Sequence, residues 1–234
     1  MIVPYHPVST AAAIFPPVLR EGDRLNGDEF LRRWEAMPEL KRAELIDGIV
    51  FMPSPVSRSH ADQHFRLCLW LGCYLEHTPG CSGGSDATWL MGQNEVPQPD
   101  VALRILPEFG GQSLDKGEYC AGAPELIVEI SGSSSSRDLG IKLDLYRRAG
   151  VREYLTVLLK PRQVIWRQLV RGRYREMALG EDGLLRSVVF PGLWLNPAAL
   201  WDSKLPLRTT VEQGVRSPEH AAFVKRLGAA RARK

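Results

Sequence analysis

The segment PELIVEIS, residues 124–131, places a carboxylate inside what its composition indicates is a buried β-strand. The apolar residues Leu126, Val128 and Ile130 share one face of such a strand, and Glu129 falls on the other face. A run this apolar usually has both faces covered, which argues against a place at the edge of a sheet. Because burying an unpaired carboxylate costs several kcal/mol, Glu129 has to be exposed, paired or bound to a metal ion.

The order of helical and strand patterns along the chain predicts an α/β fold of the mixed α+β kind. The strand-like segments are short, apolar and bounded by turn-forming residues, and they crowd toward the C-terminal half. Asp47-Gly48 is a hairpin turn signal, and Gly150 is placed to end a helix. We therefore expect a mixed β-sheet flanked by helices, with extra C-terminal strands. Helices are expected over residues 26–37, 57–80 (largely buried) and 135–150, and strands on either side of 47–48 and over 85–91, 99–106, 125–131, 152–159, 163–170 and 173–179.

The charge distribution separates a C-terminal segment from the rest of the chain. The net charge is +3 over 234 residues, yet residues 204–234 hold eight Lys and Arg against two Glu. A basic tail of this kind indicates contact with a polyanion or a solubilising extension. A helix from Pro218 is expected in it, and both partner docking and disorder stay open. Residues 1–24 are proline-rich and aperiodic, which indicates an N-terminal arm.

The cysteines and the hydropathy of the sequence indicate in which cellular compartment the protein is expected. The cysteines Cys68, Cys73, Cys81 and Cys120 form no CxxC pair, so neither a zinc ribbon nor a thioredoxin-like motif is indicated. Reduced thiols in a cytoplasmic protein are the expectation. The longest apolar stretches fall short of the roughly 18 residues that a membrane span needs. The segment AAAIFPPVL is broken by proline and has no basic flank before it, so no signal peptide is expected.

Asp100 raises the same question as Glu129, because it opens the apolar segment PDVALRIL. Two carboxylates at adjacent strand ends repel each other unless a divalent cation lies between them. Mg²⁺ takes oxygen ligands and needs only one or two protein carboxylates in addition to water. Mg²⁺, with Mn²⁺ as a substitute, would lower the pKa of a bound water and neutralise phosphate charge, as phosphodiester hydrolysis requires. One metal site would explain both residues.

Lys142 is the candidate cation that completes such a site. In a helix over residues 135–150, Lys142 shares a face with Leu145 and Tyr146, and these neighbours favour contact with the sheet. The alternative is an exposed i,i+4 ion pair between Asp138 and Lys142, an arrangement that is common on helix surfaces. The residues alone leave these two interpretations about equal.

Six segments of the chain occur in an order that is typical of one nuclease family. They are AELIDGIV (43–50), SRSH (57–60), PD (99–100), PELIVEIS (124–131), RDLGIKLDLYRRAGVREYLTV (137–157) and FPGLWL (190–195). The pair Pro99-Asp100 followed by Glu129-x-Ser131 resembles the PD-(D/E)xK nuclease superfamily. The whole set is similar to the Uma-two family of restriction-endonuclease-like proteins.

The resemblance implies roles for four residues. Asp100 and Glu129 would be metal ligands, and Lys142 would be the active-site lysine, since Ser131 stands where the wider superfamily has its lysine. Glu44 matches an acidic position near the site, where it would hold a second metal ion or orient Lys142. A hairpin charge with a structural partner is the alternative for Glu44.

The resemblance also implies an architecture and a substrate. A restriction-endonuclease-like domain would occupy residues 25–202, between the arm at 1–24 and a basic extension at 203–234. DNA is the implied partner, and a homodimer is expected because cutting both strands favours two active sites. The chain departs from the family pattern at Gly132, where proline is usual. After EYL it also lacks the usual Trp and acidic residue.

Two other motifs carry weaker signals. His60 and His64 have the spacing of a helical zinc pair, but HADQH lacks the Glu that metalloproteases place after the first His. A zinc site is therefore disfavoured, and His60 is a candidate for the wall of the nuclease cleft. The serines at 133–136 lack the Gly-Lys-Ser/Thr ending of a P-loop, so they indicate a loop that caps the following helix.

Three functions fit these observations. The first is a Mg²⁺-dependent endonuclease that hydrolyses DNA, and the retention of an acid-acid-lysine set favours it. The second is a non-catalytic nucleic-acid-binding or regulatory module of the same fold. The third is a phosphodiesterase for small nucleotides, which the slight acidity of the chain outside its basic tail favours.

Overall fold

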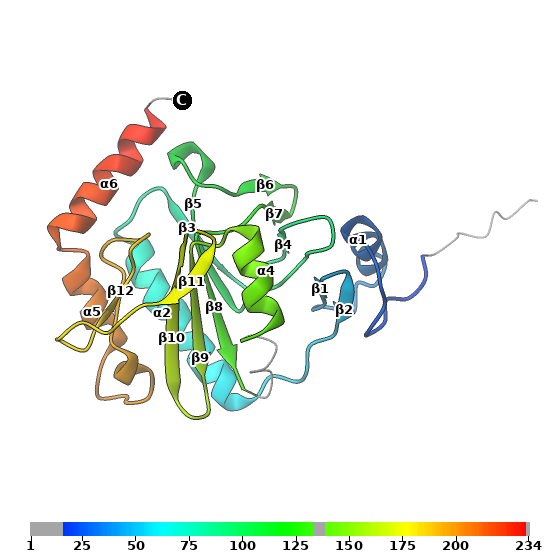
Figure 1. Cartoon of the computed structure of the whole chain (residues 1–234), viewed down its shortest axis with the longest axis horizontal. Coiled ribbons are helices and arrows are strands. Elements are labelled where there is room, and N and C mark those ends of the chain that lie inside the picture. Colours follow the sequence, from blue (N-terminus) through cyan, green and yellow to red (C-terminus); the bar gives the residue numbers. More distant parts are fainter. Residues whose placement is uncertain (1–15, 133–138, 233–234) are drawn as a thin grey trace, which may run out of the picture.

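The central feature of the fold is a six-stranded sheet (Figure 1). A computed structural model describes residues 16–132 and 139–232 of the chain. The strands are β3 (Cys81–Ser85), β5 (Val101–Ile105), β8 (Leu126–Ser131), β9 (Glu153–Leu158), β10 (Gln163–Val170) and β11 (Arg173–Glu176). Their order is β11-β10-β9-β8-β5-β3. The β8–β9 pair is parallel and the other neighbouring pairs are antiparallel, so the sheet is mixed.

Helices and short strands surround this sheet. The α-helices are α1 (Gly27–Glu35), α2 (Arg58–Leu75), α4 (Ile141–Ala149), α5 (Leu207–Gly214) and α6 (Pro218–Arg231). The 3₁₀ helices are η1 (Pro107–Phe109) and η2 (Pro197–Leu200). The small sheets are the hairpin of β1 (Glu44–Ile46) and β2 (Ile49–Phe51), the set β4 (Trp89–Leu90), β6 (Leu114–Lys116) and β7 (Tyr119–Ala121), and the pair β12 (Leu185–Arg186) and β13 (Trp194–Leu195).

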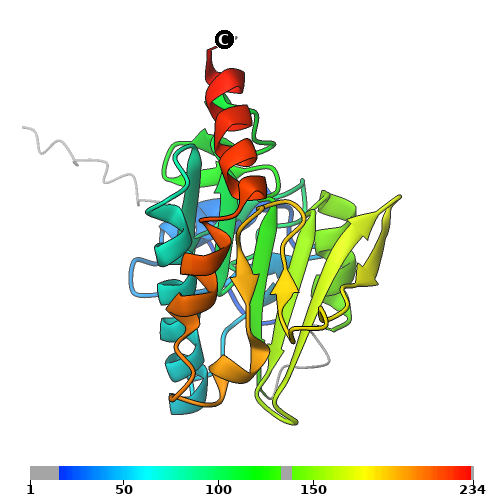
Figure 2. The ribbon, with the colours of Figure 1, turned by 90° about the vertical axis from the view of Figure 1, so that its left-hand side faces the viewer.

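Helices cover both faces of the sheet, with α2 and α5 on one side and α4 on the other (Figure 2). Val128 of β8 packs in one hydrophobic cluster with Trp70 of α2. Its neighbour Ile127 packs in a second cluster with Tyr146 of α4. The alternation expected for this strand is therefore present, and Glu129 lies on the α4 side.

Ser57, Asp47-Gly48 and Gly150 act as the sequence predicts, whereas α4 begins at Ile141 after Gly140 with no side-chain cap, and the serines 133–136 expected to cap this helix lie outside the described residues. Ser57 accepts a hydrogen bond from the His60 amide and so begins α2. Asp47 and Gly48 have φ angles of 52° and 72°, the left-handed pair that a tight turn between β1 and β2 requires. Gly150, with φ of 85°, ends α4.

Other elements differ from the expectations, such as β11, which ends at Glu176 and not at residue 179. The glycine-rich residues 81–85 form edge strand β3, because backbone pairing with β5 needs no apolar side chain. A Cβ at Gly83 would lie 3.0 Å from Leu75, which explains a small residue there. The segment 85–91 was expected to be one strand, but Ser85 ends β3 and Trp89–Leu90 forms the separate strand β4. Helix α2 is buried on one side only, since Phe65 and Leu69 are 76% and 52% exposed.

The described residues outside the expected domain pack against it. The Gly22 amide donates to the Val50 carbonyl of β2 over 2.8 Å. Phe223 and Leu227 of α6 are buried in the same cluster as the side chains of α2. The helix expected in the tail is thus docked on the core, and the domain boundary at residue 203 stays a prediction. None of the helices in the described part of the chain is long and apolar enough to cross a membrane.

Candidate active site

The pairing of β5 with β8 brings Asp100 next to Glu129. Val101 lies opposite Val128 in the antiparallel register, so one further step along each strand reaches the two acidic residues. The Ile130 amide donates a hydrogen bond to Asp100 Oδ2 over 2.7 Å. Asp100 and Glu129 are 7% and 3% exposed, so two carboxylates meet in a largely buried place.

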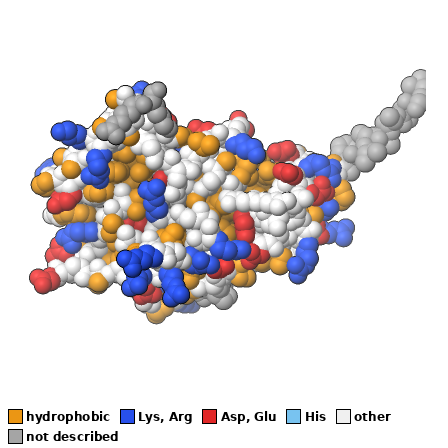
Figure 3. Space-filling view, turned by 45° about the horizontal axis from the view of Figure 1, so that its top comes forward, with side chains coloured by type: hydrophobic (Ala, Val, Ile, Leu, Met, Phe, Trp, Pro, Cys, Tyr) orange, Lys and Arg blue, Asp and Glu red, His pale blue; other side chains and the backbone are white. Residues whose placement is uncertain are grey.

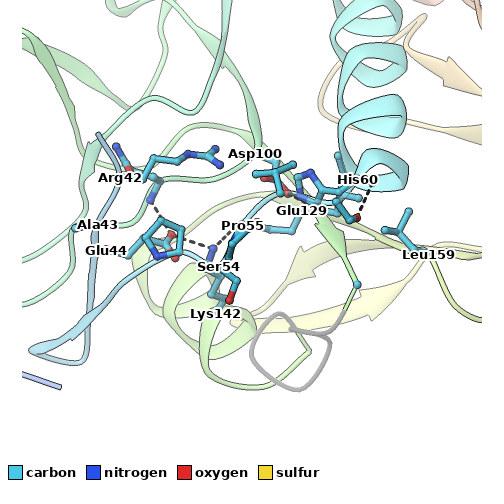
Figure 4. A pocket seen from close by; sticks show the side chains of 16 residues that line it. Arg42, Ala43, Glu44, Ser54, Pro55, His60, Asp100, Glu129, Lys142 and Leu159 are labelled. Carbon is cyan, nitrogen blue, oxygen red and sulfur yellow. Dashed lines mark hydrogen bonds and ion pairs between the residues drawn. The ribbon is translucent and has the colours of Figure 1, made fainter. Parts of the chain in front are cut away.

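Both carboxylates line a cavity of about 290 Å³ (Figure 4). Its walls come from the start of β1, the segment that leads into α2, the residues just before β5, the C-terminal end of β8, the first turn of α4 and Leu159 after β9. The four residues predicted from the sequence, Glu44, Asp100, Glu129 and Lys142, all line it. The cavity therefore brings the four predicted residues together from segments that are far apart in the sequence.

Glu129 is held by two donors on α4. Lys142 Nζ and Tyr146 Oη lie 2.9 Å and 2.6 Å from Glu129 Oε1. Lys142 is only 5% exposed, which excludes the solvent-exposed position considered for it, and Asp138 falls outside the described residues. Burial raises the pKa of Tyr146 well above its ordinary value, and the Glu129 charge adds to this, so the phenol remains a donor.

Glu44 ties the hairpin to the rest of the site. Its Oε1 lies 2.9 Å from Lys142 Nζ and accepts a hydrogen bond from the backbone amide of Gln98, also over 2.9 Å. Gln98 lies two residues before Asp100 on the segment that enters β5. Glu44 therefore has Lys142 and the Gln98 backbone amide as partners, an arrangement that fits both a role in orienting Lys142 and the alternative of a hairpin charge with a structural partner.

The two histidines of α2 are directed at Asp100. His60 Nε2 lies 3.2 Å from Asp100 Oδ2, and His64 Nε2 lies 2.8 Å from the Asp100 carbonyl oxygen. Burial raises the pKa of Asp100, but the hydrogen bond and charge of His60, the Ile130 amide and the Lys142 charge outweigh it. The pKa of Asp100 is therefore below its ordinary value, so the Asp100 carboxylate remains anionic.

Three residues that the sequence did not single out as site residues belong to this arrangement. Tyr146 lies four residues after Lys142, so helical spacing predicts its face but not the partner of its hydroxyl. Gln98 anchors Glu44 through its backbone, which no side-chain pattern can signal. Arg42 lines the cavity two residues before Glu44.

The donor chemistry of the cavity fits a hard divalent cation. Asp100 and Glu129 supply carboxylate oxygens, and water and phosphate oxygens commonly fill the other positions around Mg²⁺. Gln98, which lines the cavity, has a side-chain oxygen Oε1 that is buried without a hydrogen-bond partner among the described residues, and such an atom suits contact with an ion's water shell. Within residues 16–132 and 139–232, no group of three or more His, Cys, Asp or Glu is arranged to hold a metal ion.

Comparisons with known proteins agree with this fold. No curated protein matches the chain. A crystal structure described as "a putative nuclease belonging to DUF820" from Anabaena variabilis ATCC 29413 is similar, with a TM-score of 0.54 and 15% identity over 79% of this chain and 97% of that chain. At this identity the likeness concerns the fold, and it confirms the mixed α/β architecture.

A family profile covers most of the chain. The profile of the Uma2 family, described as "Putative restriction endonuclease", matches residues 28–198. This range includes all four residues predicted for the site, and it confirms the resemblance to the Uma-two family inferred from sequence segments. The chain therefore belongs to the Uma2 family.

Proposed function

We propose that this protein is a metal-dependent endonuclease that hydrolyses DNA phosphodiester bonds. One observation carries the proposal: Asp100 and Glu129 share a cavity in which Lys142 contacts Glu129. A buried acid-acid-lysine set is costly for stability, and it is retained where it serves binding or catalysis. Mg²⁺ is the proposed cofactor, and Mn²⁺ is a substitute with the same preference for oxygen ligands.

Each residue has a distinct role in this proposal. Asp100 and Glu129 bind the cation, which supplies an activated water and neutralises phosphate charge when bound. Lys142 positions the attacking water and stabilises the negative charge that develops on the phosphate. Glu44 holds Lys142 in place through the 2.9 Å contact, and Tyr146 fixes the orientation of Glu129.

The test is cleavage of supercoiled plasmid by the purified full-length protein in Mg²⁺ or Mn²⁺. We expect nicked and linear products with either ion, none in EDTA, and none with Asp100→Ala. Cleavage that survives in Asp100→Ala would assign the activity to a contaminant. A salt-sensitive mobility shift without cleavage would support a nucleic-acid-binding module instead.

Tyr146→Phe tests how the metal ligands are positioned. The variant removes one of two donors to Glu129 Oε1, and loss of such a supporting partner typically costs about tenfold or more in metal affinity. We expect Mn²⁺ binding, measured by electron paramagnetic resonance, to weaken by about tenfold. Tyr174→Phe is the matched control, because that hydroxyl donates to the Val151 carbonyl outside the cavity. Equal Mn²⁺ affinity in both variants would limit Tyr146 to packing.

A second candidate function is hydrolysis of small nucleotides. The cavity volume of about 290 Å³ lies at the lower end of the range for small-molecule sites, which favours a ligand of this size. Incubation with cyclic mono- and dinucleotides under the same metal conditions separates the two activities. A homodimer remains a proposal that analytical ultracentrifugation tests.

A further inference from the structure

The charged side chains described so far in the cavity do not neutralise a phosphodiester bound there. Glu44, Asp100 and Glu129 contribute three carboxylates, and the Lys142 ammonium contacts two of them. A divalent ion balances this set. A phosphodiester then brings one more negative charge, and the transition state of its hydrolysis develops another. A further positively charged side chain in the cavity wall would neutralise this added negative charge.

Arg42 is placed to supply it. The residue lines the same cavity as Asp100, and in Figure 4 its side chain extends along the upper side of the pocket toward Asp100. Its guanidinium forms an ion pair with Asp86, and the Arg42 side chain is 27% exposed. One carboxylate engages at most two of the five guanidinium N–H donors, so Arg42 can bind a second anion while it keeps Asp86.

The position of Arg42 is coupled to that of Asp100. The Asp86 amide donates a hydrogen bond to the Asp100 carbonyl oxygen over 3.2 Å. The turn that holds the guanidinium is therefore fastened to the backbone of a proposed metal ligand. An arginine that is already restrained loses less conformational freedom when it binds a phosphate, so the ion pair prepares Arg42 for binding.

We propose that Arg42 is a substrate-binding residue that contacts the phosphodiester at the metal site. This inference rests on the proposed function in so far as the ligand is a nucleic acid. Arg42 donates to a non-bridging phosphate oxygen from the edge of the guanidinium that Asp86 leaves unoccupied. Lys142 then stays in contact with Glu44 and Glu129 and orients the attacking water.

The experiment compares DNA binding by the full-length protein and its variants. Basic side chains are spread over the face shown in Figure 3, so loss of charge in general must be separated from loss at the cavity. Fluorescence anisotropy measures affinity for labelled single-stranded and duplex oligonucleotides over a range of salt, with Ca²⁺ replacing Mg²⁺ to slow cleavage. For Arg42→Gln we expect affinity to fall by about tenfold and the slope of log K against log salt to fall by about one.

Three control variants isolate the role of Arg42. Arg173→Gln removes an exposed arginine from β11, at the other edge of the sheet, and should bind like wild type. Asp86→Asn removes the ion-pair partner while keeping the guanidinium, so its salt slope should match wild type. Arg42→Lys keeps the charge but not the forked donors, and should retain the slope with weaker affinity. Thermal melting establishes that each variant is folded.

The outcomes separate this inference from the nuclease proposal. If Arg42→Gln kept the wild-type salt slope, the Arg42–Asp86 ion pair would be only structural. The same would follow if Arg42→Gln and Asp86→Asn lost DNA affinity equally. If Arg42→Gln behaves in that way while the wild type cleaves plasmid, the nuclease stands and the role of Arg42 is overturned. If the wild type bound DNA in a way that depends on Arg42 but never cleaved it, the binding role of Arg42 would be supported and the nuclease proposal would be overturned. A wild type that binds neither oligonucleotide overturns both.

Discussion

Glu129→Gln should lower metal-dependent DNA cleavage by at least about 10³-fold, because a proposed ligand loses its charge while its shape is kept. The glutamine oxygen can still accept from Lys142 and Tyr146, which both contact Oε1 of the glutamate. Lys142 also keeps Glu44 as a partner, so the variant should remain folded. Single-turnover cleavage of a labelled duplex gives the rate, and isothermal titration gives Mn²⁺ affinity.

Glu125→Gln is the matched control for this experiment. Glu125 lies next to β8 and is fully buried, yet its carboxylate accepts from the Ile105 and Gln112 amides and does not line the cavity. The control should lower stability and leave the cleavage rate of the folded protein unchanged. If Glu129→Gln cleaved DNA at the same rate as Glu125→Gln, Glu129 would not be a metal ligand.

Lys142→Met should destabilise the protein by about 3–5 kcal/mol, the typical cost of leaving buried charges without their partner. Lys142 Nζ lies 2.9 Å from both Glu44 Oε1 and Glu129 Oε1. Without the ammonium, two largely buried carboxylates lie close together with no cation between them. Urea unfolding followed by circular dichroism measures the change in the free energy of unfolding, and cleavage should be lost as well.

Arg148→Met on the same helix provides the contrast. Arg148 contacts three acidic residues, Asp47, Glu95 and Asp144, but its side chain is 44% exposed. Surface ion pairs contribute little, so this variant should lose less than about 1 kcal/mol. Glu44→Gln combined with Lys142→Met should recover part of the lost stability, since one buried charge is removed. Equal losses for Lys142→Met and Arg148→Met would show that Lys142 is not the shared counter-ion.

The sequence predicts the middle of the sheet well because its signals there are local. Alternation in residues 126–131 determines which side chains of β8 face α2 and which face α4. Turn and cap residues such as Gly48, Ser57 and Gly150 act within a few residues of themselves. Strand β3 escapes this reasoning, since it is defined by pairing with β5 and not by its own side chains.

The residues next to a buried carboxylate in the sequence do not show whether it is structural or functional. Glu125, Glu129 and Glu153 all stand in or beside strands and are all buried. Burial raises the pKa of Glu153, whose carboxylate accepts from Ser187 and from two backbone amides and thus joins β9 to a distant loop. These hydrogen bonds make Glu153 a structural acid, whereas Glu129 lines the cavity. In the sequence, Glu129 stands out first by its place inside an apolar strand and then by the family resemblance, whereas composition alone treats the three residues alike.

Contacts between distant segments explain what the sequence missed in the site. Gln98 and Arg42 take part because the β1–β2 hairpin docks beside the entry to β5, where Glu44 accepts from the Gln98 amide. The Tyr146 hydroxyl reaches Glu129 because α4 packs across β8. Such docking depends on the whole core, so no motif of a few residues records it.

The cavity draws on residues from Arg42 to Leu159, and this spread determines when during synthesis it can exist. Strand β8 carries Glu129 between β5, which is translated before it, and β9, which is translated after it. A nascent chain on the ribosome cannot complete this wall until β9 has emerged and paired. The residues of the proposed site therefore come together only in a chain that has already folded around the cavity.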